Sequence, residues 1–83
     1  MNTQYADTWA LTEVAHNKEW NVWSTTAYDS DGNQIGESEY DHLQFDAEDT
    51  ARAYLDSGRC EQVRIKGRSG TVQRTYGRKG ERA

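Results

Sequence analysis

The fold of this chain is decided by DAEDTARAYLDSG, residues 46–58. Asp46 can accept hydrogen bonds from the free amides of a first helical turn, and two further acidic residues follow at the positive end of the helix dipole. One apolar stripe then recurs at helical spacing, formed by Ala47, Ala51, Tyr54 and Leu55. Gly58 readily adopts the positive φ that ends a helix. We therefore predict a helix over residues 47–57.

Three segments before this helix have the pattern of β-strands. They cover residues 9–15, 20–28 and 34–42, with an extension of the third to Phe45 left open, and the second is the richest in the aromatic and β-branched residues that suit a pleated sheet. Between the second and third segments, Asp31-Gly32 supplies the positive φ that a tight hairpin turn needs. The pattern predicts a hairpin whose turn spans residues 29–33.

Two more strands are expected after the helix. Val63 and Ile65 alternate with Arg64 and Lys66, so the apolar pair should point inward and the basic pair outward. A turn from Gly67 to Gly70 then leads into a fifth strand over residues 71–76.

The order βββαββ predicts an α+β fold in which one helix packs on one face of an antiparallel sheet of about five strands. We expect a single domain over residues 1–76 and a flexible basic tail over residues 77–83. Nine aromatic residues among 83 are enough to form a core, which argues against disorder.

Composition also limits the cellular setting. One cysteine, Cys60, cannot form an internal disulfide, and small secreted domains usually carry several. Residues 1–10 lack the basic and apolar regions of a signal peptide, and no stretch approaches the roughly 20 apolar residues of a membrane span. We therefore expect a cytoplasmic protein with no membrane contact.

Charge is divided unevenly along the chain. Residues 1–58 carry two basic and twelve acidic side chains, whereas residues 59–83 carry eight basic and two acidic ones, for a net charge of −4. Such a division indicates either an interaction surface or a basic hairpin that folds against acidic neighbours. The sequence leaves both alternatives open.

No motif predicts catalysis, a metal or a cofactor. His16, His42 and Cys60 have neither the spacing of a zinc site nor a residue to orient a nucleophile and base. The turn at residues 29–33 begins like a calcium loop, but Gln34 and Tyr40 stand where that loop requires Gly and Glu. We expect a plain turn there and no enzyme activity.

Two sets of residues are candidates for contact with a protein partner. Glu37, Glu39 and Asp41 would share one face of a strand and form an acidic stripe for a basic partner, unless they are simply solvated. In the strand before them we expect Trp20 inward and Trp23 outward. An exposed Trp23 would be a contact hot spot, or would pack flat on neighbouring Tyr side chains.

A basic hairpin and tail form the candidate surface for nucleic acid or an acidic partner. Its members are Arg64, Lys66, Arg68, Arg74, Arg78 and Lys79. Contacts of such residues with phosphate would be salt-dependent and insensitive to sequence. The acidic balance of the whole chain opposes this alternative.

The second half of the chain resembles DUF2188, a family of small bacterial and phage proteins of unknown function. The resemblance covers about residues 20–79 and rests on a Trp-containing strand, the helix opening FDAEDTARAYL, the strand EQVRIKG and the ending GTVQRTYGRKG. The matching positions are Trp20, Phe45, Ala51, Val63, Ile65, Gly70, Val72, Gln73, Tyr76 and Gly77. Arg78-Lys79 replace the Asp-Pro that usually closes the family pattern. The resemblance implies the α+β fold and assigns no activity.

These features lead us to expect a small non-enzymatic protein that docks on a larger protein or nucleoprotein complex. One concrete form is a phage or mobile-element inhibitor of a host defence or nucleic-acid-processing complex, similar in action to an anti-CRISPR protein. The alternative is a nucleic-acid-binding module that uses the basic hairpin.

Overall fold

A computed structural model describes residues 8–77 of the chain. The elements follow the predicted order βββαββ. Their bounds are β1 (Trp9–Asn17), β2 (Val22–Tyr28), β3 (Gln34–Asp41), α1 (Gln44–Asp56), β4 (Cys60–Lys66) and β5 (Val72–Gly77). The prediction of an α+β fold with five strands and one helix is therefore confirmed.

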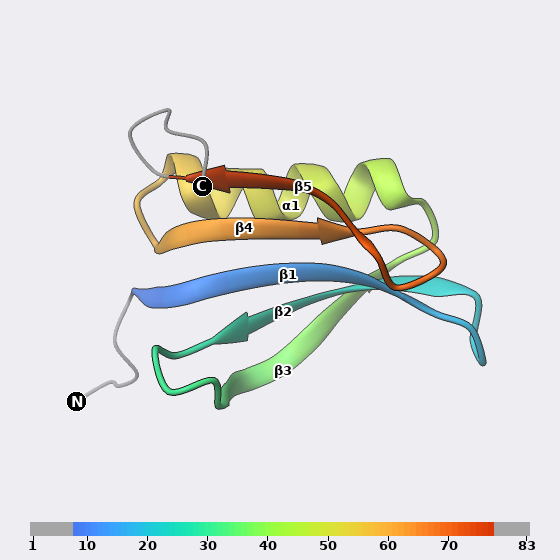
Figure 1. The fold of residues 1–83 in the computed structure, drawn as a ribbon, viewed down its shortest axis with the longest axis horizontal. Helices are drawn as coiled ribbons and strands as arrows, with labels where there is room; N and C mark the ends of the chain where they lie inside the picture. The colour runs from blue at the N-terminus through green and yellow to red at the C-terminus, as the bar shows by residue number, and fades with distance from the viewer. Residues whose placement is uncertain (1–7, 78–83) are drawn as a thin grey trace.

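The five strands form one sheet in the order β3-β2-β1-β4-β5 (Figure 1). β1 pairs with β2 in antiparallel fashion and with β4 in parallel fashion. The sheet is thus mixed, and the prediction of a purely antiparallel sheet is wrong at this central pair. The helix carries the chain back along the sheet after β3, so β4 enters in the same direction as β1. Alternation of apolar residues carries no information about strand direction.

The helix begins earlier than the sequence predicts. α1 starts at Gln44, Leu43 occupies the N-cap position, and no side chain caps the first turn, so the prediction that Asp46 is the cap is wrong. The Gln44 side chain donates to the Lys66 carbonyl at 3.4 Å and to the Gln73 side chain at 3.1 Å. The first turn of α1 has no side-chain cap. Its contacts with the β4–β5 hairpin hold it in place instead.

The end of the helix follows the prediction. Gly58 has a φ of +82°, its N–H bonds to the Leu55 carbonyl, and the Arg59 N–H bonds to the Tyr54 carbonyl. This pair of bonds is the Schellman motif, which satisfies carbonyls that the last helical turn leaves free. The sharp turn lets β4 begin at Cys60, two residues after the glycine.

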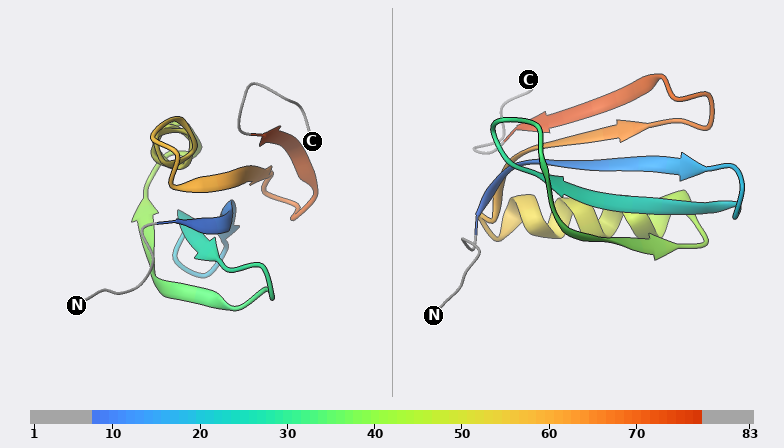
Figure 2. Two further views of the ribbon diagram at one scale, coloured as in Figure 1. Left: turned by 90° about the vertical axis from the view of Figure 1, so that its left-hand side faces the viewer. Right: turned by 90° about the horizontal axis from the view of Figure 1, so that it is seen from below.

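The helix lies on one side of the sheet (Figure 2). Its small residues Ala47 and Ala51 are fully buried and allow a close approach to the strands. The core on this side consists of Val14, Trp23, Ala47, Ala51, Leu55, Cys60, Val63 and Ile65. Val63 and Ile65 point inward as predicted, because the alternation of β4 places them under the helix.

Side chains of the helix reach both edge strands of the sheet. A sheet of five strands is about 19 Å wide, whereas a helix with its side chains is about 10 Å across. Tyr54 donates a hydrogen bond to Glu39 of β3. Toward the other edge, buried Glu48 pairs with Arg74 at 2.6 Å and accepts from the Tyr76 hydroxyl at 3.2 Å. Polar bridges therefore hold the edges that the helix backbone does not cover.

The two tryptophans around β2 lie opposite to expectation. Trp23 is 3% exposed and belongs to the core, whereas Trp20 is 72% exposed and precedes β2. The turn before β2 is closed by the Trp20 amide, which donates to the Asn17 side chain at 3.0 Å, and by Asn21 with φ +54°. Because β2 starts only at Val22, Trp20 is not part of its alternation. The prediction that Trp23 is an exposed anchor is wrong.

Two further expectations concern the C-terminal tail and membrane contact. The flexible tail predicted over residues 77–83 lies outside the described residues from residue 78 onward, and so do Arg78 and Lys79. Within residues 8–77, the helix is too short and too polar to cross a membrane.

We expect the two tryptophans to differ sharply in their effect on stability. Trp23→Ala should lower the free energy of unfolding by about 3–5 kcal/mol, because it removes a buried aromatic ring and leaves a cavity. Trp20→Ala should change it by less than about 0.5 kcal/mol, because the ring is exposed. Urea denaturation followed by circular dichroism measures both values. Equal effects of the two substitutions would contradict the assignment of Trp23 to the core.

Candidate functional site

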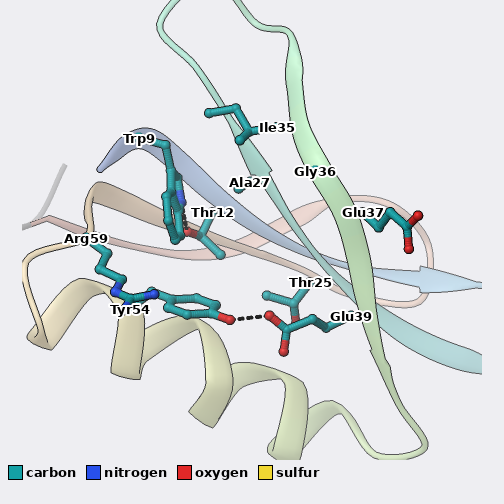
Figure 3. Close-up of a pocket in the computed structure, with 10 residues that line it drawn as sticks. All are labelled: Trp9, Thr12, Thr25, Ala27, Ile35, Gly36, Glu37, Glu39, Tyr54 and Arg59. Atoms are coloured by element: carbon teal, nitrogen blue, oxygen red, sulfur yellow. Dashed lines mark hydrogen bonds between the residues drawn. The ribbon is translucent and has the colours of Figure 1, made fainter. Parts of the chain in front are cut away.

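A cavity of about 290 Å³ lies beside β3, on the side of the sheet that the helix covers (Figure 3). We call it the β3 pocket. It is lined by the first half of β1, the second half of β2, most of β3, the last part of α1 and the turn between α1 and β4. Its lining residues are Trp9, Thr12, Thr25, Ala27, Ile35, Gly36, Glu37, Glu39, Tyr54 and Arg59.

Two aromatic rings form a corner of this pocket. The centroids of the Trp9 and Tyr54 rings are 5.2 Å apart, and their planes meet at 73°. The indole N–H of Trp9 donates to the Thr12 hydroxyl at 2.7 Å, and Thr12 itself is buried. This bond fixes the orientation of the Trp9 ring, so the corner is built before any ligand arrives.

A carboxylate stands across from these rings. Glu39 of β3 accepts a hydrogen bond from the Tyr54 hydroxyl, which joins the edge strand to the helix (Figure 3). This hydrogen bond, together with partial burial and the negative charge of Glu39, raises the pKa of Tyr54 from 10.0 to about 12. Tyr54 is therefore neutral and can donate this hydrogen bond over the physiological pH range.

The three acidic candidates of β3 have different surroundings. Glu39 is paired in register with Thr25, and Asp41 with Trp23, so both stand beside residues that are buried on the helix side. Glu37 also lines the pocket, but its side chain points away from Trp9 and Tyr54 in Figure 3. Within residues 8–77, none of the three forms an ion pair.

Gly36 explains why Glu37 departs from a regular stripe. Its φ is +67°, a left-handed value that glycine adopts without strain. The register with β2 shifts between Thr25 and Ala27, which marks a bulge in β3 at this point. A sequence pattern with period two does not reveal such a bulge.

The basic candidates of the β4–β5 hairpin are engaged within the chain. Arg64 and Lys66 both approach Glu13, at 3.1 Å and 3.5 Å, and Arg74 pairs with Glu48. The Arg68 guanidinium lies over the ring of Trp23, 5.8 Å from its centroid. For Arg64, Lys66 and Arg74 these ion pairs favour internal neutralisation over a free phosphate-binding surface, whereas Arg68 forms no ion pair with a carboxylate of residues 8–77.

Exposed apolar residues gather at one end of the molecule. β1, β3 and β4 run toward this end, and β2, α1 and β5 start from it (Figure 1). The exposed large hydrophobic residues within residues 8–77 all lie in or next to the three connections at this end. They are Trp20, Tyr40, Leu43, Phe45 and Val72, and we call them the apolar end surface.

Sequence reasoning missed this surface. Leu43 and Phe45 precede the predicted helix and fall outside the apolar stripe that begins at Ala47, which was a usable signal of exposure. Tyr40 and Val72 gave no such signal, because each stands in a strand pattern that is compatible with burial. Their meeting at one end depends on the direction of every strand.

The remaining candidates do not converge on a reactive centre. His16 packs against Trp23 with 4.8 Å between ring centroids and 55° between the ring planes, His42 is exposed and Cys60 is fully buried. At the β2–β3 turn, the Asp29 carboxylate accepts from the amides of Asp31 and Asn33, both at 2.9 Å, as in an ordinary turn. In the described part of the chain, no three His, Cys, Asp or Glu side chains gather as metal ligands.

Comparison of the chain with protein family models, with curated proteins and with solved structures finds no match. The resemblance to DUF2188 stays a prediction that rests on the quoted residues. Function must therefore be inferred from the surfaces of the molecule.

The Tyr54–Glu39 hydrogen bond predicts a late step in the alkaline titration of the protein. The contribution of neutral Tyr54 to stability is complete below pH 10.0 and is lost as the pH rises toward about 12, because the pKa of the folded form is raised. Tyrosinate absorbance should show a component near pH 12 that Tyr54→Phe removes. Glu39→Gln should move this component toward lower pH. An unchanged titration curve in both variants would show that the bond is absent in solution.

Proposed function

We propose that this protein is a non-enzymatic binding protein that docks on a larger protein through the apolar end surface. The observation that carries the proposal is the gathering of Trp20, Tyr40, Leu43, Phe45 and Val72 at one end. Single exposed apolar residues are common on any protein, but a group of large ones in one region is typical of a contact surface.

The opposite end of the molecule provides an internal comparison. Its described connections are the β2–β3 turn and the α1–β4 turn, and neither contributes an exposed large hydrophobic residue. Both ends are built from tight connections of similar length, so their shared construction does not explain the difference. Removal of apolar area from water by a partner would explain it, since burial is favourable by about 25 cal/mol per Å².

The residue types at this end also favour a protein partner. Aromatic residues are frequent among the few that dominate the binding energy of protein interfaces. Trp20 is 72% exposed and Phe45 is 73% exposed, so each can bury most of its ring on contact. The internal pairing of Arg64, Lys66 and Arg74 argues against nucleic acid as the main partner.

Docking of this kind is how a small inhibitor from a phage or mobile element would act on a host defence or nucleic-acid-processing complex. A protein of 83 residues can block a surface without any chemistry of its own. That biological setting stays a prediction.

The proposal predicts that Trp20→Ala and Phe45→Ala each weaken partner binding by about 30-fold and that the double variant weakens it by roughly 1,000-fold, because hot-spot residues each contribute about 2 kcal/mol. Proteins retained from a cell lysate by the wild type are identified, and the affinity of the recovered partner is then measured for each variant. Asp31→Ala, in the turn at the opposite end, is the control and should bind normally.

Two outcomes would contradict the proposal. Wild-type affinity of the double variant would place the contact surface elsewhere. Loss of the captured material after nuclease treatment, with a steep fall in affinity as salt rises and a strong effect of Arg68→Glu, would favour the nucleic-acid alternative.

A further inference from the structure

The β3 pocket has the size and shape of a small-ligand site that is separate from the apolar end surface. Its volume of about 290 Å³ is close to the lower end of the range for ligand pockets, about 300 Å³. Trp9 starts β1, Ile35 lies near the start of β3 and Arg59 precedes β4, so the pocket extends to the end opposite to Trp20. A ligand here would leave the apolar end surface free.

The aromatic corner of the pocket suits a cation. Trp9 and Tyr54 meet at 73°, so a group placed in the corner contacts the face of one ring and the edge or face of the other. Ring faces carry partial negative charge and attract ammonium groups, most strongly in Trp. The bond from the Trp9 indole to Thr12 keeps the ring in place, which lowers the entropy cost of binding.

The charge of the pocket points the same way. Glu39 stands across from the rings with its carboxylate held by Tyr54, and Glu37 adds a second negative charge at the edge (Figure 3). Arg59 brings one positive charge, so the lining as a whole carries one net negative charge, and Glu39 is the carboxylate that stands beside the rings. Neither carboxylate forms an ion pair within residues 8–77, whereas Glu13 and Glu48 do.

We propose that the β3 pocket binds an alkylammonium group between Trp9, Tyr54 and Glu39. The group could belong to a free small molecule or to the end of a lysine side chain, since both offer the same positive charge on an apolar stem. The two rings would contact the alkyl carbons and Glu39 would balance the charge. This proposal is independent of the docking function proposed above, because it uses other residues.

The first experiment compares a cation with its neutral isostere. Choline and 3,3-dimethylbutan-1-ol have nearly the same shape, and only choline is charged. The full-length protein is titrated with each while NMR follows the indole N–H of Trp9, assigned with Trp9→Phe. We expect choline to shift this signal in a saturable way and the alcohol to bind at least about fivefold more weakly. Equal binding of the two would overturn the proposal.

The source of the ammonium group is tested with Nα-acetyl-lysine amide. Tighter binding of this compound than of choline supports a lysine side chain of a protein, and the reverse supports a free small molecule. Acetylation of its ε-amine removes the charge and should abolish the shift of the Trp9 signal. Undiminished binding of the acetylated compound would overturn the proposal.

Matched substitutions identify the residues that recognise the charge. Glu39→Gln keeps the shape of the side chain and should weaken choline binding by about fivefold, while Glu37→Gln, whose side chain points away from the rings, should change it by less than about twofold (Figure 3). Trp9→Ala should weaken binding by about 2- to 30-fold, with circular dichroism as the check that the variant folds.

Arg59→Gln separates a cation from an anion as the ligand class. Removal of this positive charge should tighten choline binding by about twofold or more, because it relieves repulsion inside the pocket. If Arg59→Gln instead abolishes binding, or if Glu39→Gln leaves choline binding unchanged, the pocket is not a cation site. Substitutions of Trp20 and Phe45 lie outside the pocket and should leave choline binding unchanged. Each proposal can therefore be refuted without affecting the other.

Discussion

A single helix covers one face of a sheet that is about twice as wide as the helix itself. This difference in width explains the polar bridges to the edge strands and the hollow beside β3. The buried alanines of α1 bring it close to the central strands, and the edges are held by longer polar side chains: Tyr54 reaches Glu39 of β3, and Glu48 reaches Arg74 and Tyr76 of β5. On the β5 side the bridge is an ion pair with a buried carboxylate. On the β3 side it spans a hollow, and that hollow is the β3 pocket.

The same asymmetry bears on how the divided charge of the chain is distributed. Arg64 and Lys66 share Glu13, and Arg74 is held by Glu48, so three basic side chains of the hairpin have a carboxylate partner within the molecule. The carboxylates of β3 receive no cation from residues 8–77. Three carboxylates without an ion pair in this part of the chain therefore lie on one edge strand, and Glu39 among them stands next to the rings of Trp9 and Tyr54. Charge there favours a positively charged ligand more than it favours phosphate.

Two separate surfaces follow from the topology. The apolar end surface arises where three strands finish and the helix starts, whereas the β3 pocket lies toward the other end. A small domain buries a limited fraction of its surface, so large exposed rings are costly unless a partner covers them. Because they are separate, the proposed docking surface and the proposed ammonium pocket could be occupied at the same time.

The sequence by itself determined the elements, and the tertiary structure decided their partners. The helix stop at Gly58, the hairpin at residues 29–33 and the inward pair Val63 and Ile65 were all predictable, because capping, turn and alternation rules act over a few neighbouring residues. The parallel pairing of β1 with β4 was not, since strand direction depends on where the crossover helix places the chain. The burial of Trp23 and the exposure of Trp20 were not predictable either, because both residues fit a strand pattern. Only the start of β2 at Val22 and the position of the helix distinguish them. The β3 pocket brings together residues 9, 39, 54 and 59. The apolar end surface brings together residues that lie as far apart in the sequence as Trp20 and Val72. Such long-range neighbours are fixed by packing, about which local sequence carries no information.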